Sequence, residues 1–204
     1  DQEEYKQKIA KAANWVIGMQ SSDGGWGAFD IDNSYFYLNN IPFADHGALL
    51  DPSTSDLTGR CVEVLSMLGY GHDFPPIARA LKFLRKEQEE CGAWFGRWGV
   101  NYIYGTWSVL KGLGALGEDT SLPYIRRAVD WLKSCQNSDN GWGETSHSYS
   151  DPSIGGNGRS TPSQTAWALL GLMAVGEVES SAVQRGIHYL LGAQTQQGVW
   201  DEED

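Results

Sequence analysis

The residues best suited to chemistry in this sequence are aromatic and lie together in the stretch GRWGVNYIYGT, residues 96–106. It holds Trp98, Tyr102 and Tyr104, with a single arginine and no other charge. The face of an aromatic ring attracts a cation through its quadrupole, by about 2 kcal/mol or more per ring when water is excluded. Because a connecting loop normally faces water, this much aromatic surface favours a loop that lines a dry cavity and stabilises a positive charge there.

The overall charge excludes one class of partner. The 204 residues carry a net charge of −11, whereas a surface that binds nucleic acid needs lysines and arginines to neutralise phosphates. The same charge gives no electrostatic attraction to anionic lipid. A hydrophobic content of 41% is enough for a core, and no apolar run reaches the roughly 20 residues of a transmembrane helix. We therefore expect a globular domain that binds no nucleic acid.

Four segments share the same ending, a glutamine followed six residues later by a tryptophan, which we call the Gln–Trp turn. Counting back from each glutamine, small or aliphatic residues recur at positions −11, −8, −7 and −4, and position −5 is always aromatic. This spacing forms one apolar stripe of an amphipathic helix. The sequence therefore predicts four half-exposed helices. Their turns are QSSDGGW (20–26), QEECGAW (88–94), QNSDNGW (136–142) and QTQQGVW (194–200).

Three further segments, residues 58–69, 105–117 and 161–176, alternate with these amphipathic helices and are apolar nearly all round. Each ends in glycine, the usual residue after a helix C-terminus. Helices that are apolar on every side are buried, so these segments predict an inner layer covered by the four outer helices. We expect an all-α fold, an α/α barrel of alternating inner and outer helices. Residues 1–204 would form a single partial barrel domain, because three inner helices are too few to close a ring.

The connections from outer to inner helices differ in length, whereas those from inner to outer helices are short and uniform. Because the helices alternate in direction, all the variable connections lie at one end of the barrel. Such connections carry the functional residues in many folds. The aromatic stretch belongs to one of them, so we expect the site at that end.

The Gln–Trp turns resemble the QW motifs of triterpene cyclases. Residues 24–60, GGWGAFDIDNSYFYLNNIPFADHGALLDPSTSDLTGR, are similar to a loop of bacterial squalene–hopene cyclases. GRWGVNYIYGT and STPSQTAWALL (160–170) extend the resemblance over essentially the whole chain. Oxidosqualene cyclases share the first of these stretches and the turns, but their counterpart of DLTGR usually differs. The sequence is therefore identified as a member of the squalene–hopene cyclases.

This resemblance implies a terpene cyclase of hopanoid biosynthesis, an isomerase with two α-barrel domains and no metal or organic cofactor. Such an enzyme protonates a terminal double bond of squalene and guides the cation through successive ring closures to hopene or hopanol. The resemblance also implies association with a membrane surface, on the cytoplasmic side of the bacterial inner membrane.

The family's proton donor is the central aspartate of a DxDD motif, which this sequence lacks. The resemblance places that motif upstream of residue 1, and the nearest string, Asp30-Ile-Asp32-Asn33, is better explained by solvated loop carboxylates. We therefore expect the 204 residues to be an internal or C-terminal fragment that is soluble and does not cyclise squalene by itself. Its open barrel edges could be covered by forming a homodimer.

The resemblance implies catalytic roles for four residues. Arg60 stands where the family pairs a histidine or arginine with the acid, and Tyr104 matches a tyrosine near the hydrogen bonds of that acid. Asp51 and Asp56 correspond to loop aspartates that affect activity. Simpler explanations also fit: Arg60 could form an ordinary salt bridge at a helix start, Asp56 could cap that helix, and Asp51 could set a turn before Pro52.

Three aromatic residues are expected to contact the substrate by the same resemblance. Trp98 matches a cavity tryptophan, with plain core packing as the alternative. Phe29 stands where some members have tyrosine, and it keeps the ring face that stabilises a cation. Phe43 resembles part of the constriction of the substrate channel.

The glutamines and tryptophans of the turns are expected to be structural. The four histidines are scattered and form no metal-binding constellation, which argues against the zinc-dependent protein prenyltransferases that share a similar barrel. Two other functions remain open: another class II terpene cyclase such as an oxidosqualene cyclase, or an α/α-toroid binding module that has lost the chemistry.

Overall fold

The computed structural model describes residues 2–41 and 49–202, and the regular secondary structure within them is helical apart from three isolated β-bridges. The expected all-α fold is confirmed. The α-helices are α1 (Gln2–Gly18), α2 (Ser55–Met67), α3 (Pro75–Lys86), α4 (Tyr102–Leu116), α5 (Pro123–Ser134), α6 (Pro162–Ala174) and α7 (Ser181–Ala193). Short 3-10 helices are η1 (Phe36–Asn40), η2 (Ser146–Tyr149) and η3 (Pro152–Ile154).

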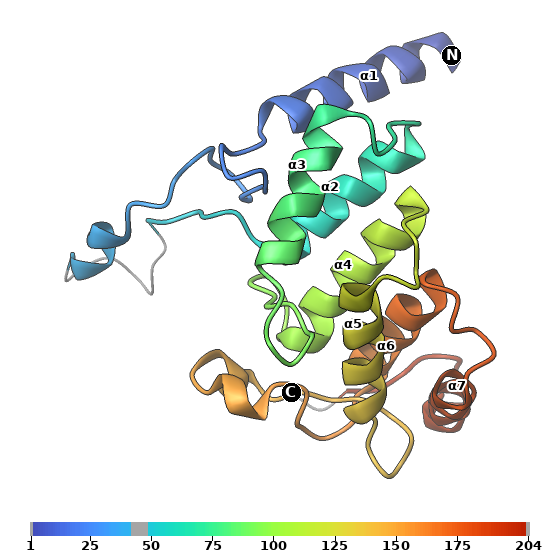
Figure 1. Ribbon diagram of the computed structural model, residues 1–204. Helices are drawn as coiled ribbons and strands as arrows, with labels where there is room; N and C mark the ends of the chain where they lie inside the picture. Colours follow the sequence, from blue (N-terminus) through green and yellow to red (C-terminus); the bar gives the residue numbers. More distant parts are fainter. Residues whose placement is uncertain (1, 42–48, 203–204) are drawn as a thin grey trace.

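The helices form two layers of an α/α barrel. In the inner layer α4 lies between α2 and α6, and each of the outer helices α3, α5 and α7 packs against the inner helix that precedes it (Figure 1). The N-terminal helix α1 lies at the α2 end of this arc. The predicted alternation of outer and inner helices is therefore confirmed.

The prediction that all three inner helices are buried on most sides is correct only for α4. Ten of its residues are buried, because it has an inner neighbour on each side. The other two inner helices have one such neighbour and expose apolar side chains on the open face. Met67 of α2 is 75% exposed and Leu170 of α6 is 42% exposed.

Glycines allow the inner helices to approach closely. A β-carbon placed on Gly112 of α4 would lie 2.3 Å from the carbonyl oxygen of Gly59 in α2. A β-carbon on Gly59 would lie 2.6 Å from the carbonyl oxygen of Ser108 in α4. Both contacts involve backbone atoms, which cannot move aside as a flexible side chain can. The two glycines therefore set the spacing between α2 and α4.

We expect the substitution Gly112→Ala to lower the free energy of unfolding by about 2 kcal/mol, because α2 and α4 must separate. This loss outweighs the gain of about 1 kcal/mol that alanine brings to a helix interior. Gly192→Ala in α7 is the matched control, because a β-carbon there meets no atom within 4 Å, and it should stabilise the chain slightly. Urea denaturation of both variants measures the difference, and equal stabilities would disprove the close-contact explanation.

Each of the first three Gln–Trp turns joins its own helix to the next outer helix through the glutamine. The Gln136 amide donates to the carbonyl oxygens of Asn140 in its own turn and Ala182 in α7, both at 2.9 Å. Its carbonyl oxygen accepts from Arg185 of α7. Gln88 and Gln20 make the same three contacts one and two repeats earlier, respectively. Their expected structural role is confirmed.

The tryptophan of each of the first three turns forms hydrogen bonds to the end of the preceding outer helix and to the start of the next inner helix. The Trp142 indole donates to the carbonyl oxygen of Leu132 in α5 at 2.7 Å, and its backbone N–H donates to the hydroxyl of Thr165 in α6 at 2.9 Å. Thr58 and Thr106 accept from the two preceding turns in the same way. The three threonines are fully buried, so they fix where each inner helix begins.

Two inner helices begin three residues earlier than predicted. Helix α2 begins at Ser55 rather than at residue 58, and α4 begins at Tyr102 rather than at residue 105. The end of the aromatic stretch is therefore helical, and Tyr104 lies in the first turn of α4. Arg60 lies in the second turn of α2, so the expectation that it stands at a helix start is wrong.

Candidate functional site

The three connections that lead from outer to inner helices meet at one end of the arc. Arg97, before α4, donates to the carbonyl oxygen of Leu50, before α2, at 3.0 Å. The hydroxyl of Tyr149, before α6, lies 2.9 Å from the carbonyl oxygen of Gly99 and 3.1 Å from that of Gly96. These contacts confirm the prediction that the variable connections gather at one end.

Asp51 holds the first of these connections. Its carboxylate accepts the backbone N–H groups of Ala28 at 3.0 Å, of Asp30 at 2.7 Å and of Phe29. Only 5% of Asp51 is exposed. The suggestion that Asp51 merely sets a local turn is wrong, because it fixes backbone more than 20 residues away. Through that contact Asp51 places the Phe29 ring.

Asp56 places Trp98 in a similar way. Its carboxylate accepts the backbone N–H of Trp98 at 3.0 Å and that of Leu57 at 2.9 Å, and it is buried. Asp56 is not the N-cap residue of α2, which is Thr54, but it accepts one backbone N–H of the first turn, so the capping alternative is correct in part. Asp56 also joins α2 to the aromatic stretch before α4.

Arg60 lies one turn further along α2 than Asp56. Its guanidinium donates to Glu63 at 2.9 Å and lies 5.0 Å from the centroid of the Trp107 ring. Glu63 also pairs with Lys111 of α4 at 3.3 Å. The salt bridge considered as an alternative is therefore present, but its partner lies on the same helix and Arg60 keeps a cation–π contact beside it.

Tyr104 is the centre of an aromatic cluster on α4 and α6. Its ring centroid lies 5.4 Å from that of Trp107 and 5.1 Å from that of Trp167, and the two indoles stack at 5.8 Å. Burial raises the pKa of the Tyr104 hydroxyl, Asp56 raises it further, and Arg60 lowers it. The hydroxyl is therefore a neutral hydrogen-bond donor at pH 7.

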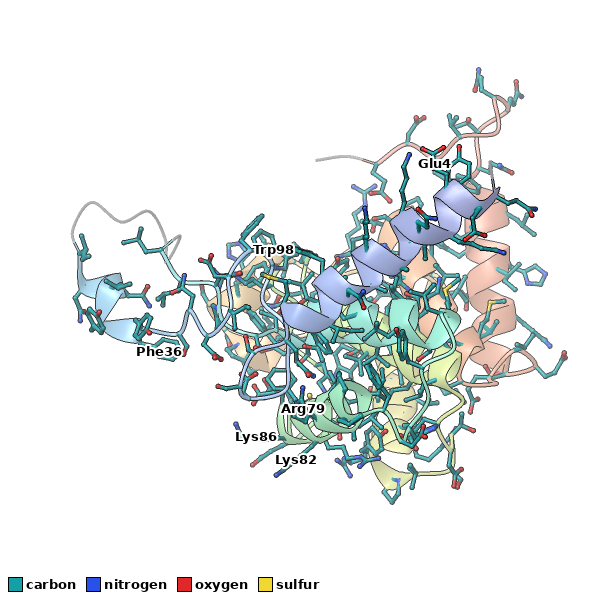
Figure 2. All side chains as sticks on the ribbon, turned by 90° about the horizontal axis from the view of Figure 1, so that it is seen from above. Glu4, Phe36, Arg79, Lys82, Lys86 and Trp98 are labelled. Atoms are coloured by element: carbon teal, nitrogen blue, oxygen red, sulfur yellow. The ribbon has the colours of Figure 1, made fainter. Side chains whose placement is uncertain are left out.

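Trp98 and Phe29 form an edge-to-face pair that closes one side of this group. Their ring centroids are 5.7 Å apart with an interplanar angle of 84°. Both rings reach solvent, with 47% of Trp98 and 71% of Phe29 exposed. Figure 2 shows Trp98 at the side of the molecule from which the first connection extends. Phe43 lies outside the described residues.

The structure thus brings five of the seven expected site residues into one group: Phe29, Trp98, Asp56, Arg60 and Tyr104. Asp51 lies at its edge and supports it through the backbone before Phe29. The group combines a buried carboxylate, a guanidinium, a neutral phenol and several ring faces. Such a set can tune an acid and stabilise a cation.

Two supporting residues were missed by the sequence analysis. Glu144 is buried, and its carboxylate accepts the backbone N–H of Ile103 at 2.9 Å. Tyr149 holds the backbone of the aromatic stretch through its hydroxyl, and burial raises its pKa to about 12. Both belong to the connection before α6, which holds no repeated motif. The sequence signal that could have identified this connection is the acidic Glu144, two residues after the end of the third turn in the string GWGE.

No group of three or more potential metal ligands occurs in the described residues. In the same residues, no helix is both long and apolar enough to cross a membrane.

Comparison with known proteins shows which family this chain resembles in sequence. Residues 1–204 match the family model described as the squalene-hopene cyclase C-terminal domain. A probable squalene–hopene cyclase of Sinorhizobium fredii is 56% identical over 202 residues, and the enzyme of Alicyclobacillus acidocaldarius is 48% identical over 202 residues. These matches cover 98% and 99% of this chain but 31% and 32% of the relatives. The chain thus spans about a third of their length.

A solved structure supports the fold. The type II terpene cyclase MstE_R337A from Scytonema, in complex with geranylgeranyl dihydroxybenzoate, matches with a TM-score of 0.65 and 22% identity. The match covers 94% of this chain and 50% of the other. At this level of identity the likeness concerns the α/α architecture alone.

Proposed function

Because the chain belongs to the squalene–hopene cyclase family, we propose that it forms one wall of an active site that cyclises squalene through carbocations. The observation that carries this proposal is the grouping of Asp56, Arg60 and Tyr104 beside the Trp98–Phe29 pair. In the proposed reaction an acid transfers its proton to a terminal double bond, whose π electrons form the new C–H bond. The cation then moves through ring closures until loss of a proton from carbon gives hopene, or addition of water and loss of a proton from its oxygen gives hopanol.

Arg60 and Tyr104 would act on the acid. A guanidinium beside a carboxylic acid favours its ionised form and so makes it a better proton donor. The neutral hydroxyl of Tyr104 can donate a hydrogen bond to the carboxylate left behind. Asp56 would position Trp98, through the N–H contact, for a role in binding the substrate.

The aromatic residues would stabilise the cation. Trp98 and Phe29 present ring faces near the loops, and Phe43 is proposed to narrow the route by which substrate enters. Asp51 would serve the reaction by holding Phe29.

We do not propose Asp30 or Asp32 as the proton donor. Asp32 accepts from the backbone N–H and the hydroxyl of Ser22 at 2.7 and 2.9 Å, and Asp30 accepts from Asn33 at 2.8 Å. Both carboxyl groups are exposed, so each would give its proton to water rather than to an alkene. The donor would come from a segment of the longer enzyme outside these 204 residues, and residues 1–204 would be part of one of its barrel domains. The whole enzyme would act at a membrane surface, where its hydrocarbon substrate dissolves.

A chimera tests this proposal directly. The third of the Alicyclobacillus enzyme that matches this chain is replaced by these 204 residues, and the product formed from squalene is identified by gas chromatography–mass spectrometry. We expect the chimera to form hopene and the 204-residue chain alone to form none, because the chain lacks the DxDD acid.

Three outcomes would contradict the proposal. A folded chimera that cyclises neither squalene nor oxidosqualene would favour the binding-module alternative, and one that accepts oxidosqualene alone would favour the other class of cyclase. Hopene from the isolated chain would show that a donor lies within it.

A further inference from the structure

Trp107 of α4 contacts both of the neighbouring inner helices. The Arg60 guanidinium of α2 lies over its ring, 5.0 Å from the ring centroid. The indole of Trp167 in α6 stacks on the same ring, with a centroid distance of 5.8 Å and an interplanar angle of 9°. Because α4 lies between α2 and α6 in the inner layer (Figure 1), the Trp107 ring has a fixed place in the candidate site and Arg60 is held against it.

Packing alone does not explain a tryptophan at position 107. The residue is 9% exposed, and its indole N–H has no hydrogen-bond partner in the part of the chain that the structure describes. A buried donor without a partner destabilises the fold, and phenylalanine or leucine would fill the space without that penalty. Tryptophan, however, has the aromatic face that attracts a cation most strongly. The unpaired N–H therefore favours a role in which the ring face holds Arg60.

The charge of Arg60 is compensated only in part by the carboxylate beside it. One oxygen of Glu63 lies 2.9 Å from Arg60, and the other lies 3.3 Å from Lys111 of α4. One acidic and two basic groups give this cluster a net charge of +1, and the nearby Asp56 carboxylate is occupied by two backbone N–H groups. The Arg60 side chain is 44% exposed, against 13% for Glu63. The guanidinium therefore remains accessible to an anion from another segment.

A ring face can hold a guanidinium without using its hydrogen-bond donors. Arginine has five N–H groups, and Arg60 donates to Glu63 through Nη1. A second carboxylate in the place of Trp107 would take further donors and neutralise the charge. The Trp107 ring attracts the cation through its quadrupole instead, so the remaining donors and the charge stay available. A carboxylic acid beside such a group ionises more readily.

We infer that Trp107 is a positioning residue, which holds the Arg60 guanidinium on its ring face and so directs the free N–H groups of Arg60 to the proton donor. The inference rests on the proposed function, because the donor belongs to a segment of the longer enzyme outside these 204 residues. Trp107 acts through Arg60 and not by contact with the substrate. This role differs from that of Trp98 and Phe29, whose rings reach solvent.

A double-mutant cycle in the chimera with the Alicyclobacillus enzyme tests this inference. Trp107→Leu removes the ring face and should lower kcat for squalene about tenfold, with KM changed by less than about twofold. Trp107→Phe keeps a smaller ring face and should lower kcat about threefold. In an Arg60→His background the side chain ends several bonds earlier but can still carry a positive charge. There Trp107→Leu should lower kcat by less than about twofold, because the contact that it removes is already lost.

Urea denaturation of the 204-residue chain gives a second measurement, which needs no activity. Trp107→Leu should lower the urea midpoint by about 0.3 M more when residue 60 is arginine than in the Arg60→His background. The matched control is Trp131→Leu in the outer helix α5, because Trp131 is also 9% exposed. Its effect on the midpoint should be the same in both backgrounds.

Three results would overturn the inference. Equal losses of kcat in both backgrounds, or a rise in KM in place of a fall in kcat, would mean that Trp107 contacts the substrate or serves packing alone. Equal midpoint shifts of Trp107→Leu in both backgrounds would mean that its ring does not hold Arg60. An active chimera with any of these results would leave the proposed function intact. An inactive chimera would contradict the proposed function, while the urea measurement would still test the contact between Trp107 and Arg60.

Discussion

The substitution Asp51→Asn is expected to lower the free energy of unfolding by about 3 kcal/mol. One carboxylate oxygen of Asp51 accepts the N–H groups of both Phe29 and Asp30, and the other accepts that of Ala28. An asparagine amide has one oxygen and one NH2 group, so at least one backbone donor would face another donor. Hydrogen bonds to a charged acceptor contribute about 1.5–3 kcal/mol each, and a buried unpaired donor adds a penalty. Urea denaturation measures the loss.

The control is Asp32→Asn in the same connection. Asp32 is exposed and has a backbone φ of 55°, a left-handed conformation that asparagine tolerates well. We expect its stability to change by less than about 0.5 kcal/mol. If Asp51→Asn were as stable as this control, the three hydrogen bonds would not hold the connection.

Limited proteolysis distinguishes a local from a global effect of Asp51→Asn. Loss of the three hydrogen bonds should expose the connection between α1 and α2 to protease under conditions in which the helical layers stay intact. In the chimera the same substitution would lower activity by releasing Phe29 rather than by removing a reacting group. Asp51 would then be a positioning residue, and its effect on activity would follow its effect on the loop.

The outer helices could be predicted from the sequence because their information is local and repeated. Each carries the same apolar stripe and ends in the same turn, so four copies reinforce one another. The starts of α2 and α4 were predicted three residues late, because Ser55 and Asp56 are polar and because residues 102–104 were assigned to the aromatic loop. Their helical state depends on a hydrogen bond from a distant turn to each threonine.

The candidate site was predicted in composition but not in its contacts. The residues Asp56 and Trp98 lie 42 positions apart in the sequence, and no local pattern shows that one holds the other. The Arg60–Glu63 pair has the spacing of helical neighbours, and both residues lie within the helix predicted over residues 58–69, so this contact could have been predicted from the sequence. Glu144 and Tyr149 lie in a connection of unique sequence, so no repeat could identify them.

The substitution Gln136→Ala is expected to lower the free energy of unfolding by about 2–3 kcal/mol. It removes two hydrogen bonds to backbone carbonyls and one from Arg185, and at about 1 kcal/mol each these account for the loss. The effect is large because Gln136 joins α5 to α7 across the barrel wall. Urea denaturation again measures it.

The fourth turn supplies the control for this prediction. Within residues 2–41 and 49–202, the Gln194 side chain makes one hydrogen bond, to the carbonyl oxygen of Gly198 in its own turn. The tryptophan of this turn, Trp200, is 43% exposed, whereas Trp142 of the third turn is fully buried. Gln194→Ala should therefore cost less than about 1 kcal/mol. If both substitutions cost the same, the glutamines would stabilise only their own turns. A difference of 1–2 kcal/mol would show that the repeated glutamine stabilises the barrel by joining successive outer helices.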